Sequence, residues 1–322
     1  MRAIVTTRNG GVEAMKVEQR PDPTPGKDQV LVRVKAAGLN FADILARQGL
    51  YPDGPPKPCV MGYEVSGIVE AVGDGVDQTL IGKPVIAMTK FKGQAELVAV
   101  PAAQAFEKPE QLSFEQSAAL PTNYLTAWAL IVTMGGLKKD EAILIHNAGG
   151  GVGLAALDIA KHIGARTYGT ASPSKHLFLK ERGLDHAIDY RKQDWLPVLM
   201  DLTQGRGVEL VIDPLGGKSW KQSYRALRTT GSMGVFGKAV AQMPKFNPLG
   251  LMNRNKGVFG LNLGHMWGEG EKVAGWTREI MRGVAEGWIR PHVDRAFPFD
   301  QIADAHAYIE ARKNIGKIVL VP

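Results

Sequence analysis

Cysteine is almost absent from this sequence, since Cys59 is the only one among 322 residues. A single cysteine excludes an intramolecular disulfide and any zinc site built from a cluster of cysteines. Its neighbours Lys57, Pro58 and Val60 include no histidine that could activate the thiol. Cys59 is therefore expected to be a buried structural residue and not a nucleophile.

Long apolar runs are also missing, although 44% of the residues are hydrophobic and 22% are charged. These fractions are ordinary for a soluble globular protein. No run of about eighteen apolar residues occurs, so no membrane-spanning helix is expected. The first residues, Met1 and Arg2, lead directly into a strand-like Ala-Ile-Val, without a secretory or transit segment. These absences predict a cytoplasmic protein without an integral membrane segment.

Charge of one sign is not concentrated in any stretch. The formal net charge is +7, from 39 Lys and Arg against 32 Asp and Glu. The basic residues form no long run and are not interleaved with aromatic residues, as nucleic-acid binding would favour. No nucleic-acid partner is expected, and the excess positive charge is interpreted as an aid to solubility and to attracting an anionic cofactor.

The most informative stretch joins a short apolar run, 142–146, to a glycine-rich turn and a helix that begins near Gly151. The dinucleotide-binding pattern Gly-x-Gly-x-x-Gly is matched by Ala148, Gly150 and Gly153. A small residue closes the turn, Gly150 lets the backbone approach a pyrophosphate, and Gly153 lets the helix pack on the strand. The helix N-terminus adds N–H groups and a positive dipole end. Such turns also occur only to make a tight bend, and the motif alone leaves that alternative open.

The second predicted strand, 166–171, decides which dinucleotide is expected. An NAD site would place Asp or Glu near its end, about twenty residues beyond the glycines, to bind the ribose 2′-hydroxyl. This sequence has Ser172, Ser174 and Lys175 there, and its first acid, Glu181, lies a helix turn or more beyond. A missing carboxylate and a nearby cation suit a 2′-phosphate, which predicts NADP(H). The alternative for Lys175 is an ordinary solvated lysine near a helix start.

Two patterns of predicted elements divide the chain. Residues 1 to about 120 show short strands with little helix, which indicates a compact barrel. From Ala142 onward strands and helices alternate, as in a parallel sheet covered on both faces. A helix is predicted from Ser113, with a kink at Pro121. The six strands of the parallel sheet are expected near 142–146, 166–171, 186–188, 208–212, 232–236 and 257–261.

Several ordered motifs identify a family. They are the segments 37–43, 47–51, 62–67, 125–127, 148–153, 213–217 and 314–317, together with Lys175 and Tyr190. With these residues the sequence closely resembles the zinc-free quinone oxidoreductase branch of the medium-chain dehydrogenase/reductase superfamily, and within it the vesicle amine transport protein type. The resemblance implies a fold of class α/β with the cofactor in a cleft between domains: a GroES-like β-barrel catalytic domain (1–121), a Rossmann NADP-binding domain (122–261) and a C-terminal segment (262–322) that returns to the catalytic domain.

The resemblance also implies that this chain holds no metal. Zinc-containing relatives carry a cysteine ligand where Asn40 falls and a histidine ligand where Tyr63 falls. Neither side chain is a usual zinc donor. Glu64, which matches a residue near the metal in those relatives, is interpreted as a structural residue paired inside the cleft wall.

The same resemblance implies which residues hold the cofactor. Asn40 and Tyr51 would face the nicotinamide, Lys175 would meet the 2′-phosphate, Tyr190 would lie against the adenosine half, and Asn314 would reach back from the tail. Structural alternatives remain, namely a helix cap for Asn40, a surface aromatic for Tyr190 and a turn residue for Asn314. The complete set of implied cofactor-binding residues is Asn40, Tyr51, Thr126, Ala148, Gly149, Gly150, Gly151, Val152, Gly169, Ser172, Lys175, Tyr190, Phe236, Gly237, Phe259, Gly260, Leu261 and Asn314.

The predicted function is an NADPH-dependent, metal-independent oxidoreductase that passes hydride to quinones or other electron-poor conjugated carbonyl compounds. The cofactor carries the difficult chemistry and the protein orients the reactants. The predicted catalytic residues are Asn40 and Tyr51, which would hold the acceptor oxygen as charge develops, and Tyr63. The proton would come from solvent or from a tyrosine, for which Tyr63 is the candidate. His146 is discounted, because a residue at the end of a buried strand is usually packed.

Two other functions stay open. One is an enoyl or alkenal double-bond reductase of narrower specificity, and the other is a low-turnover NADPH-binding protein with a regulatory or membrane-associated role. The substrate pocket is expected to be lined by residues 51–57 and by the segment 239–255, and to be a roomy apolar cleft covered by a mobile flap. Family analogy implies a homodimer that pairs through the edge strand 258–261.

Overall fold

The computed structural model describes residues 1–237, 239, 248–252 and 254–322. The chain forms two compact units. The first unit comprises Met1–Thr122, Glu269–Ala285 and Pro291–Pro322, and the second comprises Asn123–Gly268 and Glu286–Arg290. The domain boundaries predicted after residues 121 and 261 stay predictions.

The first unit is built from mostly antiparallel strands. One sheet has the order β2-β1-β4, and the other has the order β15-β16-β3-β5-β6-β8, with β7 also paired to β3. Its strands are β1 (Arg2–Thr6), β2 (Met15–Gln19), β3 (Gln29–Leu39), β4 (Cys59–Val60), β5 (Glu64–Val72), β6 (Pro84–Met88), β7 (Leu97–Pro101), β8 (Ala105–Glu107), β15 (Val293–Pro298) and β16 (Lys317–Val321). Its helices are α1 (Phe41–Arg47), α2 (Phe114–Ser117), α8 (Gly270–Ala285) and α9 (Ile302–Glu310).

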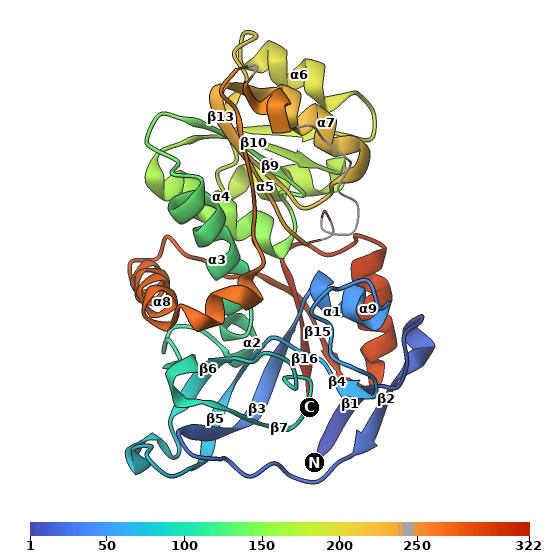
Figure 1. The fold of residues 1–322 in the computed structure, drawn as a ribbon, viewed down its shortest axis with the longest axis vertical. Coiled ribbons are helices and arrows are strands. Elements are labelled where there is room, and N and C mark those ends of the chain that lie inside the picture. The colour runs from blue at the N-terminus through green and yellow to red at the C-terminus, as the bar shows by residue number, and fades with distance from the viewer. Residues whose placement is uncertain (238, 240–247, 253) are drawn as a thin grey trace. The chain divides into compact units, whose positions relative to one another are not determined.

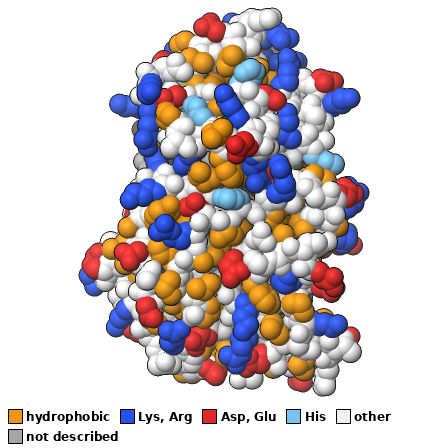
Figure 2. All heavy atoms as spheres, turned by 180° about the vertical axis from the view of Figure 1, so that it is seen from behind, with side chains coloured by type: hydrophobic (Ala, Val, Ile, Leu, Met, Phe, Trp, Pro, Cys, Tyr) orange, Lys and Arg blue, Asp and Glu red, His pale blue; other side chains and the backbone are white. Residues whose placement is uncertain are grey.

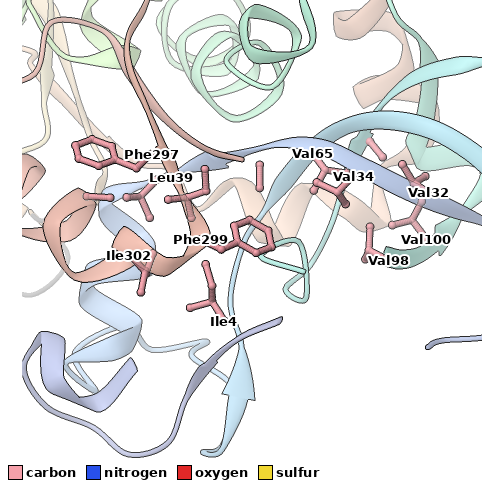
Figure 3. Close-up of a cluster of buried hydrophobic side chains, with 14 of the residues drawn as sticks. Ile4, Val32, Val34, Leu39, Val65, Val98, Val100, Phe297, Phe299 and Ile302 are labelled. Carbon is pink, nitrogen blue, oxygen red and sulfur yellow. The ribbon is translucent and has the colours of Figure 1, made fainter. Parts of the chain in front are cut away.

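The core of the first unit combines residues from both ends of the chain. In β3 the exposed Arg33 and Lys35 alternate with buried Val32 and Val34, as a strand with one buried face requires. Phe299, from the turn after β15, is fully buried in the same cluster. Figure 3 shows side chains of β1, β3, β5 and β7 around the aromatic rings and Ile302 of the C-terminal part of the chain. The tail therefore completes this core, and β16 pairs antiparallel with β3.

The second unit is a parallel sheet between helices. The strand order is β11-β10-β9-β12-β13-β14, and every neighbouring pair is parallel. The strands are β9 (Ala142–His146), β10 (Arg166–Ala171), β11 (His186–Asp189), β12 (Val208–Asp213), β13 (Leu227–Val235) and β14 (Gly257–Gly260). The helices are α4 (Gly151–Ile163), α5 (His176–Glu181), α6 (Trp195–Leu202) and α7 (Gly217–Ala226).

The central strand β9 is buried along its whole length, because helices cover both faces of the sheet. In Figure 1, α4 and α5 lie on one side of these strands, and α6 and α7 lie on the other. The α/β class predicted from the sequence is confirmed, and all six predicted strands are present. The strands that follow β9 in the sequence, β10 and β11, lie on one side of it in the sheet, whereas β12, β13 and β14 lie on its other side. Such a switch point, at the carboxyl ends of the strands, is where ligands bind in this class of sheet.

The prediction for Pro121 is wrong. Instead of kinking one long helix, Pro121 begins a new helix, α3 (Pro121–Trp128), after α2 has ended. Proline is well suited to the first position of a helix, because the N–H that it lacks would have no partner there and its φ is already helical.

Among the described residues, every helix is too short or too polar to cross a lipid bilayer. On the face shown in Figure 2, Lys and Arg side chains are spread widely and interspersed with Asp and Glu. The net positive charge is therefore not collected into one patch on this face.

Candidate functional site

The turn after β9 brings the backbone close to itself in a way that only glycine allows. A Cβ atom added to Gly150 would lie 2.5 Å from Asn147 Nδ2, and one added to Gly153 would lie 2.4 Å from Asn147 O. Gly150 is the N-cap of α4 and has no side chain of its own to cap this end. The first turn of α4, which includes Gly151 and Val152, therefore offers its main-chain N–H groups and positive dipole end to an anion.

Ala148 departs from the glycine of the usual pattern, and the structure shows why the methyl group fits. Ala148 is fully buried. A Cβ atom added to Gly169, in β10, would lie 2.8 Å from the Ala148 methyl carbon. Gly169 thus leaves the space that Ala148 fills, and the departure does not disturb the turn.

Lys175 is buried and not solvated. Its exposed fraction is 7%, and that of Ser172 at the end of β10 is also 7%. A Cβ atom added to Gly149 would lie 2.7 Å from Lys175 Cδ, so the lysine stem lies against the glycine turn. The alternative of an ordinary solvated lysine does not hold. A cation is held beside the turn at the strand end that has no carboxylate.

A residue that sequence reasoning missed lies on α3. A Cβ atom added to Gly151 would lie 2.6 Å from Asn123 Nδ2, and Asn123 is 6% exposed. The amide of Asn123 therefore lies at the start of α4. Asn123 could have been found in the sequence from its position three residues before Thr126, which is also buried in α3.

The other predicted residues of the second unit lie at strand ends. Phe236 follows β13 and is buried, whereas Gly260 ends β14 and is exposed. These two ends are adjacent, because Leu261 N donates to Val235 O at 3.0 Å. Tyr190, one residue beyond β11, is 36% exposed. The remaining predicted residues here are Gly237 and Phe259, both half-buried. Of the predicted flap, residues 240–247 and 253 lie outside the described residues.

His146 belongs to a buried series of hydrogen-bonded side chains at the carboxyl ends of the strands, called a polar line below. Its Nδ1 lies 2.9 Å from Thr170 Oγ1, and its Nε2 lies 3.0 Å from Ser223 Oγ. Ser223 donates its hydroxyl proton to Asp213 Oδ2 at 2.8 Å. Ser223 must therefore accept from His146, which places the imidazole proton on Nε2. Serine and not histidine stands in the middle, so this line is not a hydrolase triad.

A cavity of about 450 Å³ lies at the opposite edge of this sheet, around the amino ends of β9 and β10. Arg166, Arg206 and Arg228 line it. Arg166 and Arg206 donate to main-chain carbonyl groups, and Arg228 pairs with Glu209. Because this cavity is at the far end of the strands from the glycine turn, the reaction site is not assigned to it.

In the first unit, the side chain of Asn40 is held between two charged groups. Its Oδ1 accepts from Lys317 Nζ at 2.7 Å, and its Nδ2 donates to Glu64 Oε1 at 2.9 Å. Lys317 also contacts Glu64 Oε1 at 2.5 Å, and the main-chain N–H of Thr122 donates to Glu64 Oε2 at 2.7 Å. The side chains of Lys317 and Glu64 are 3% and 0% exposed. The result is a buried network in which each charged group has partners.

Lys317 was not predicted as a site residue. It appeared only within the motif 314–317, although a lysine that begins the otherwise apolar strand β16 was a possible signal. Asn314 lies in the turn before it and donates to Gly316 O at 2.8 Å. A turn role for Asn314 is therefore observed, and its role toward a cofactor stays a prediction.

Asp43 completes the polar part of this region. It is fully buried, and it accepts from the main-chain N–H groups of Asn40 at 2.8 Å and Gly62 at 3.0 Å. Burial raises the pKa of Asp43 to about 7. Asp43 thus fixes the start of α1 and with it the backbone that carries Asn40.

Tyr51 and Tyr63 form an aromatic cluster with Phe91. The ring centroids of Tyr51 and Tyr63 are 6.1 Å apart, and the two rings pack edge to face. The ring centroids of Tyr63 and Phe91 are 5.2 Å apart, and these two rings are tilted relative to each other. Burial raises the pKa of Tyr51 to about 12 and that of Tyr63 further. Both phenols are therefore protonated at neutral pH and can donate hydrogen bonds. The buried Tyr63 hydroxyl has no hydrogen-bond partner among the described residues.

Comparison with known proteins places the chain in a family. Residues 26–110 match the alcohol dehydrogenase GroES-like domain, and residues 182–320 match a family described as zinc-binding dehydrogenase. The human synaptic vesicle membrane protein VAT-1 homolog is 38% identical over the whole of this chain and 86% of its own length. The chain belongs to the medium-chain dehydrogenase/reductase superfamily. The resemblance stated from the sequence motifs is confirmed.

Solved members of the superfamily share the fold closely. The Escherichia coli quinone oxidoreductase complexed with NADPH has a TM-score of 0.94 at 30% identity, with both chains fully covered. The CurK enoyl reductase has a TM-score of 0.91 at 27% identity, covering 99% of this chain and 98% of its own.

The residues around Asn40 in this chain do not fit a catalytic zinc ion. Asn40 and Tyr63, which the family resemblance matches to the ligand positions of zinc-containing members, are not usual zinc donors, and the Asn40 carbonyl oxygen already faces the Lys317 ammonium. A second cation beside that ammonium would be repelled. Within the described ranges, no group of three or more His, Cys, Asp or Glu side chains is placed to hold a metal. No reaction step is assigned to a metal.

Proposed function

We propose that this chain is an NADPH-dependent oxidoreductase that reduces quinones or other electron-poor conjugated carbonyl compounds without a metal. The observation that carries the proposal is the buried Lys175 stem against Gly149, beside a strand end without a carboxylate. A cation in this position suits the 2′-phosphate of NADPH, whereas NAD is usually bound there through Asp or Glu.

The second unit has the features that a dinucleotide needs. Gly150 and the start of α4 would hold the pyrophosphate, and Lys175 with Ser172 would hold the 2′-phosphate. Thr126, Tyr190 and the strand ends at Phe236 and Leu261 are proposed for the remaining contacts. The close likeness to the quinone oxidoreductase solved with NADPH supports this assignment.

The first unit has hydrogen-bond donors for an acceptor oxygen. When bound, the reduced nicotinamide supplies the hydride. Asn40, Tyr51 and Tyr63 are proposed to hold the carbonyl oxygen of the acceptor while negative charge develops on it. The raised pKa values keep both phenols protonated, so each can donate at neutral pH. Tyr63 is proposed as the proton donor, because its hydroxyl is buried without a partner among the described residues.

Two rival functions have specific support. The likeness to the CurK enoyl reductase favours reduction of a carbon–carbon double bond conjugated to a carbonyl group. The 38% identity to the VAT-1 homolog favours the membrane-associated form of the NADPH-binding rival, because that relative is named as a synaptic vesicle membrane protein. Pairing of two chains through β14 and a cytoplasmic location also remain predictions.

One experiment separates these functions. Purified protein is mixed with NADPH and a panel of quinones, enones and enoyl thioesters, and nicotinamide absorbance is followed. Consumption with quinones supports the proposal, and consumption with enones or enoyl thioesters alone favours the double-bond reductase. Binding of NADPH without consumption favours the low-turnover protein, and absence of NADPH binding contradicts the whole assignment.

A further inference from the structure

We propose that Lys317 is a positioning residue that orients the side-chain amide of Asn40 as a hydrogen-bond donor, and so favours acceptors that carry a carbonyl oxygen. This inference rests on the proposed function, in which Asn40 contacts the acceptor.

The orientation of the amide follows from its neighbours. An ammonium group can only donate hydrogen bonds and an ionised carboxylate can only accept them. Asn40 Oδ1 lies 2.7 Å from Lys317 Nζ, and Asn40 Nδ2 lies 2.9 Å from Glu64 Oε1. The reverse orientation would place the amide NH₂ against the ammonium and the amide oxygen against the carboxylate. Both contacts would be repulsive, so the charged pair admits one orientation.

The oriented amide keeps one donor that a substrate can use. Asn40 Nδ2 carries two N–H groups, one of which is directed to Glu64. The other meets Gly38 O at 3.5 Å, which is at the outer limit of a hydrogen bond. A developing oxyanion would be a stronger acceptor for this N–H than the distant carbonyl. Because Lys317 polarises the amide through its oxygen, the N–H becomes a better donor.

The same orientation makes the site poor for an alcohol. Oxidation of an alcohol requires a group that accepts the hydroxyl proton or hydrogen bond. Lys317 already takes one of the two lone pairs of the Asn40 amide oxygen, and its positive charge makes that oxygen a weaker acceptor for a second donor. The amide can therefore stabilise an oxyanion but is poorly placed to accept from a hydroxyl group.

The pairing of two strands brings Lys317 to this place. Ile318 of β16 lies opposite Leu39 of β3. The residues next to this pair, Lys317 and Asn40, are consequently neighbours although 277 positions separate them. The main-chain N–H of Lys317 also donates to His292 O at 2.9 Å, which secures the start of β16.

The test compares Lys317→Met with three other variants. Lys317→Met leaves Glu64 buried without its cation and can fail to fold, so Glu64→Gln/Lys317→Met removes both charges together. Lys317→Arg keeps a cationic donor. Lys313→Met is the matched control, because Lys313 is an exposed lysine of the same segment.

For each variant, kcat and KM are measured with a quinone and with a less activated enone. We expect Lys317→Met and the double variant to lose about 100-fold in kcat with the enone, as when one oxyanion donor is removed. The loss with the quinone should be several-fold smaller, because its reduced oxygen is less basic. The KM for NADPH should be unchanged, Lys317→Arg should recover part of the activity, and Lys313→Met should match the parent protein.

A second readout needs no turnover. In NADPH-free protein with ¹⁵N-labelled asparagine, the side-chain resonances of Asn40, assigned with Asn40→Asp, should shift in Lys317→Met and in the double variant but not in Lys313→Met. Unshifted resonances in the folded double variant, or equal losses of kcat with quinone and enone, would overturn the inference. Absence of any turnover by the parent protein would overturn the proposed function, while the resonances still report the amide orientation.

Discussion

At the scale of single residues, burial decides what a polar side chain can do. Lys175 and Lys317 are both lysines in a chain with a net charge of +7, yet both are nearly inaccessible to solvent. Lysine is seldom buried without a partner, since desolvation of its charge is costly. Lys317 has Glu64 and Asn40 as partners. For Lys175, the proposed ligand phosphate would be an anionic partner when bound.

We expect Lys175→Ala to weaken binding of NADPH by about 10- to 100-fold and to change binding of NADH little, because charge-assisted hydrogen bonds contribute about 1.5–3 kcal/mol. Calorimetric titration with each nucleotide measures the difference. Lys180→Ala, at an exposed position of α5, is the control and should leave both affinities unchanged. Equal losses for the two nucleotides would contradict the assignment of the 2′-phosphate to Lys175.

At the scale of elements, buried polar lines join strands and helices that are distant in the sequence. The line from Thr170 through His146 and Ser223 to Asp213 connects β10, β9, α7 and β12. Asp213 Oδ1 also accepts from the main-chain N–H groups of Leu215 and Gly216. The line therefore holds the turn after β12, at the sheet edge where a dinucleotide is proposed to bind.

Removing the middle of this line should destabilise the second unit. Ser223→Ala leaves His146 Nε2–H without its acceptor and Asp213 Oδ2 without the Ser223 donor, which costs about 1–3 kcal/mol. Ser219→Ala is a matched control on the same helix, because the buried Ser219 hydroxyl has no partner in the described part of the chain. Urea unfolding of both variants measures the difference. Similar midpoints for Ser223→Ala and the parent would show that the line does not contribute to stability.

A second polar line joins α1 to α9. Arg47, fully buried at the end of α1, donates to His306 Nδ1 at 3.1 Å and to Glu310 Oε1 at 2.9 Å. Because Arg47 donates, His306 Nδ1 must be unprotonated. Burial, and then the Arg47 charge, lowers the pKa of His306 to about 3.

This pKa predicts how stability depends on pH. Between pH 6.5 and 3 the unfolded state binds a proton at His306 that the folded state does not, so the contribution of His306 to stability is lost as pH falls through this window. Asp43 acts in the opposite direction, because its raised pKa makes the folded state bind the extra proton below about 7. His306→Asn keeps an acceptor for Arg47 and removes only the histidine titration.

We expect the free energy of unfolding of the parent protein to fall by about 2 kcal/mol more between pH 7 and pH 5 than that of His306→Asn. Urea titrations at the two pH values measure this difference. Parallel pH dependence of the two proteins would contradict the low pKa of His306.

At the scale of the whole molecule, the chain combines a barrel that is proposed to orient an acceptor with a parallel sheet that is proposed to hold the nucleotide. The tail contributes to the barrel through β15 and β16, and it supplies Lys317 to the candidate site. The two ends of the chain are thus both needed for one set of residues around Asn40. The net charge of +7 is compatible with attraction of an anionic nucleotide, without a concentrated basic patch on the face in Figure 2.

Because the donor set around Asn40 does not fit zinc, the reductase activity should withstand prolonged dialysis against a metal chelator. Activity with the best acceptor of the panel is measured before and after dialysis, and again after zinc is added. Activity that disappears with the chelator and returns with zinc would contradict a metal-independent reaction.

Much of this protein is determined by short stretches of sequence. The strand–glycine–helix turn at 142–154, the alternation of elements after it and the lack of an acid near Ser172 depend on local spacing and residue size. Backbone geometry imposes these patterns within a few residues, and they were sufficient to predict the α/β class. The cofactor assignment also began from such a pattern.

Only the tertiary structure decided which polar groups meet. Sequence spacing could not show that Lys175 is buried against Gly149, that Ser223 stands between His146 and Asp213, or that Lys317 orients Asn40 across 277 positions. Such contacts depend on strand pairing and close packing between distant segments, and a local pattern carries no information about the partner. The sequence therefore determined the framework and the nucleotide class, whereas the packed structure determined the partners and the orientation of the groups at the site.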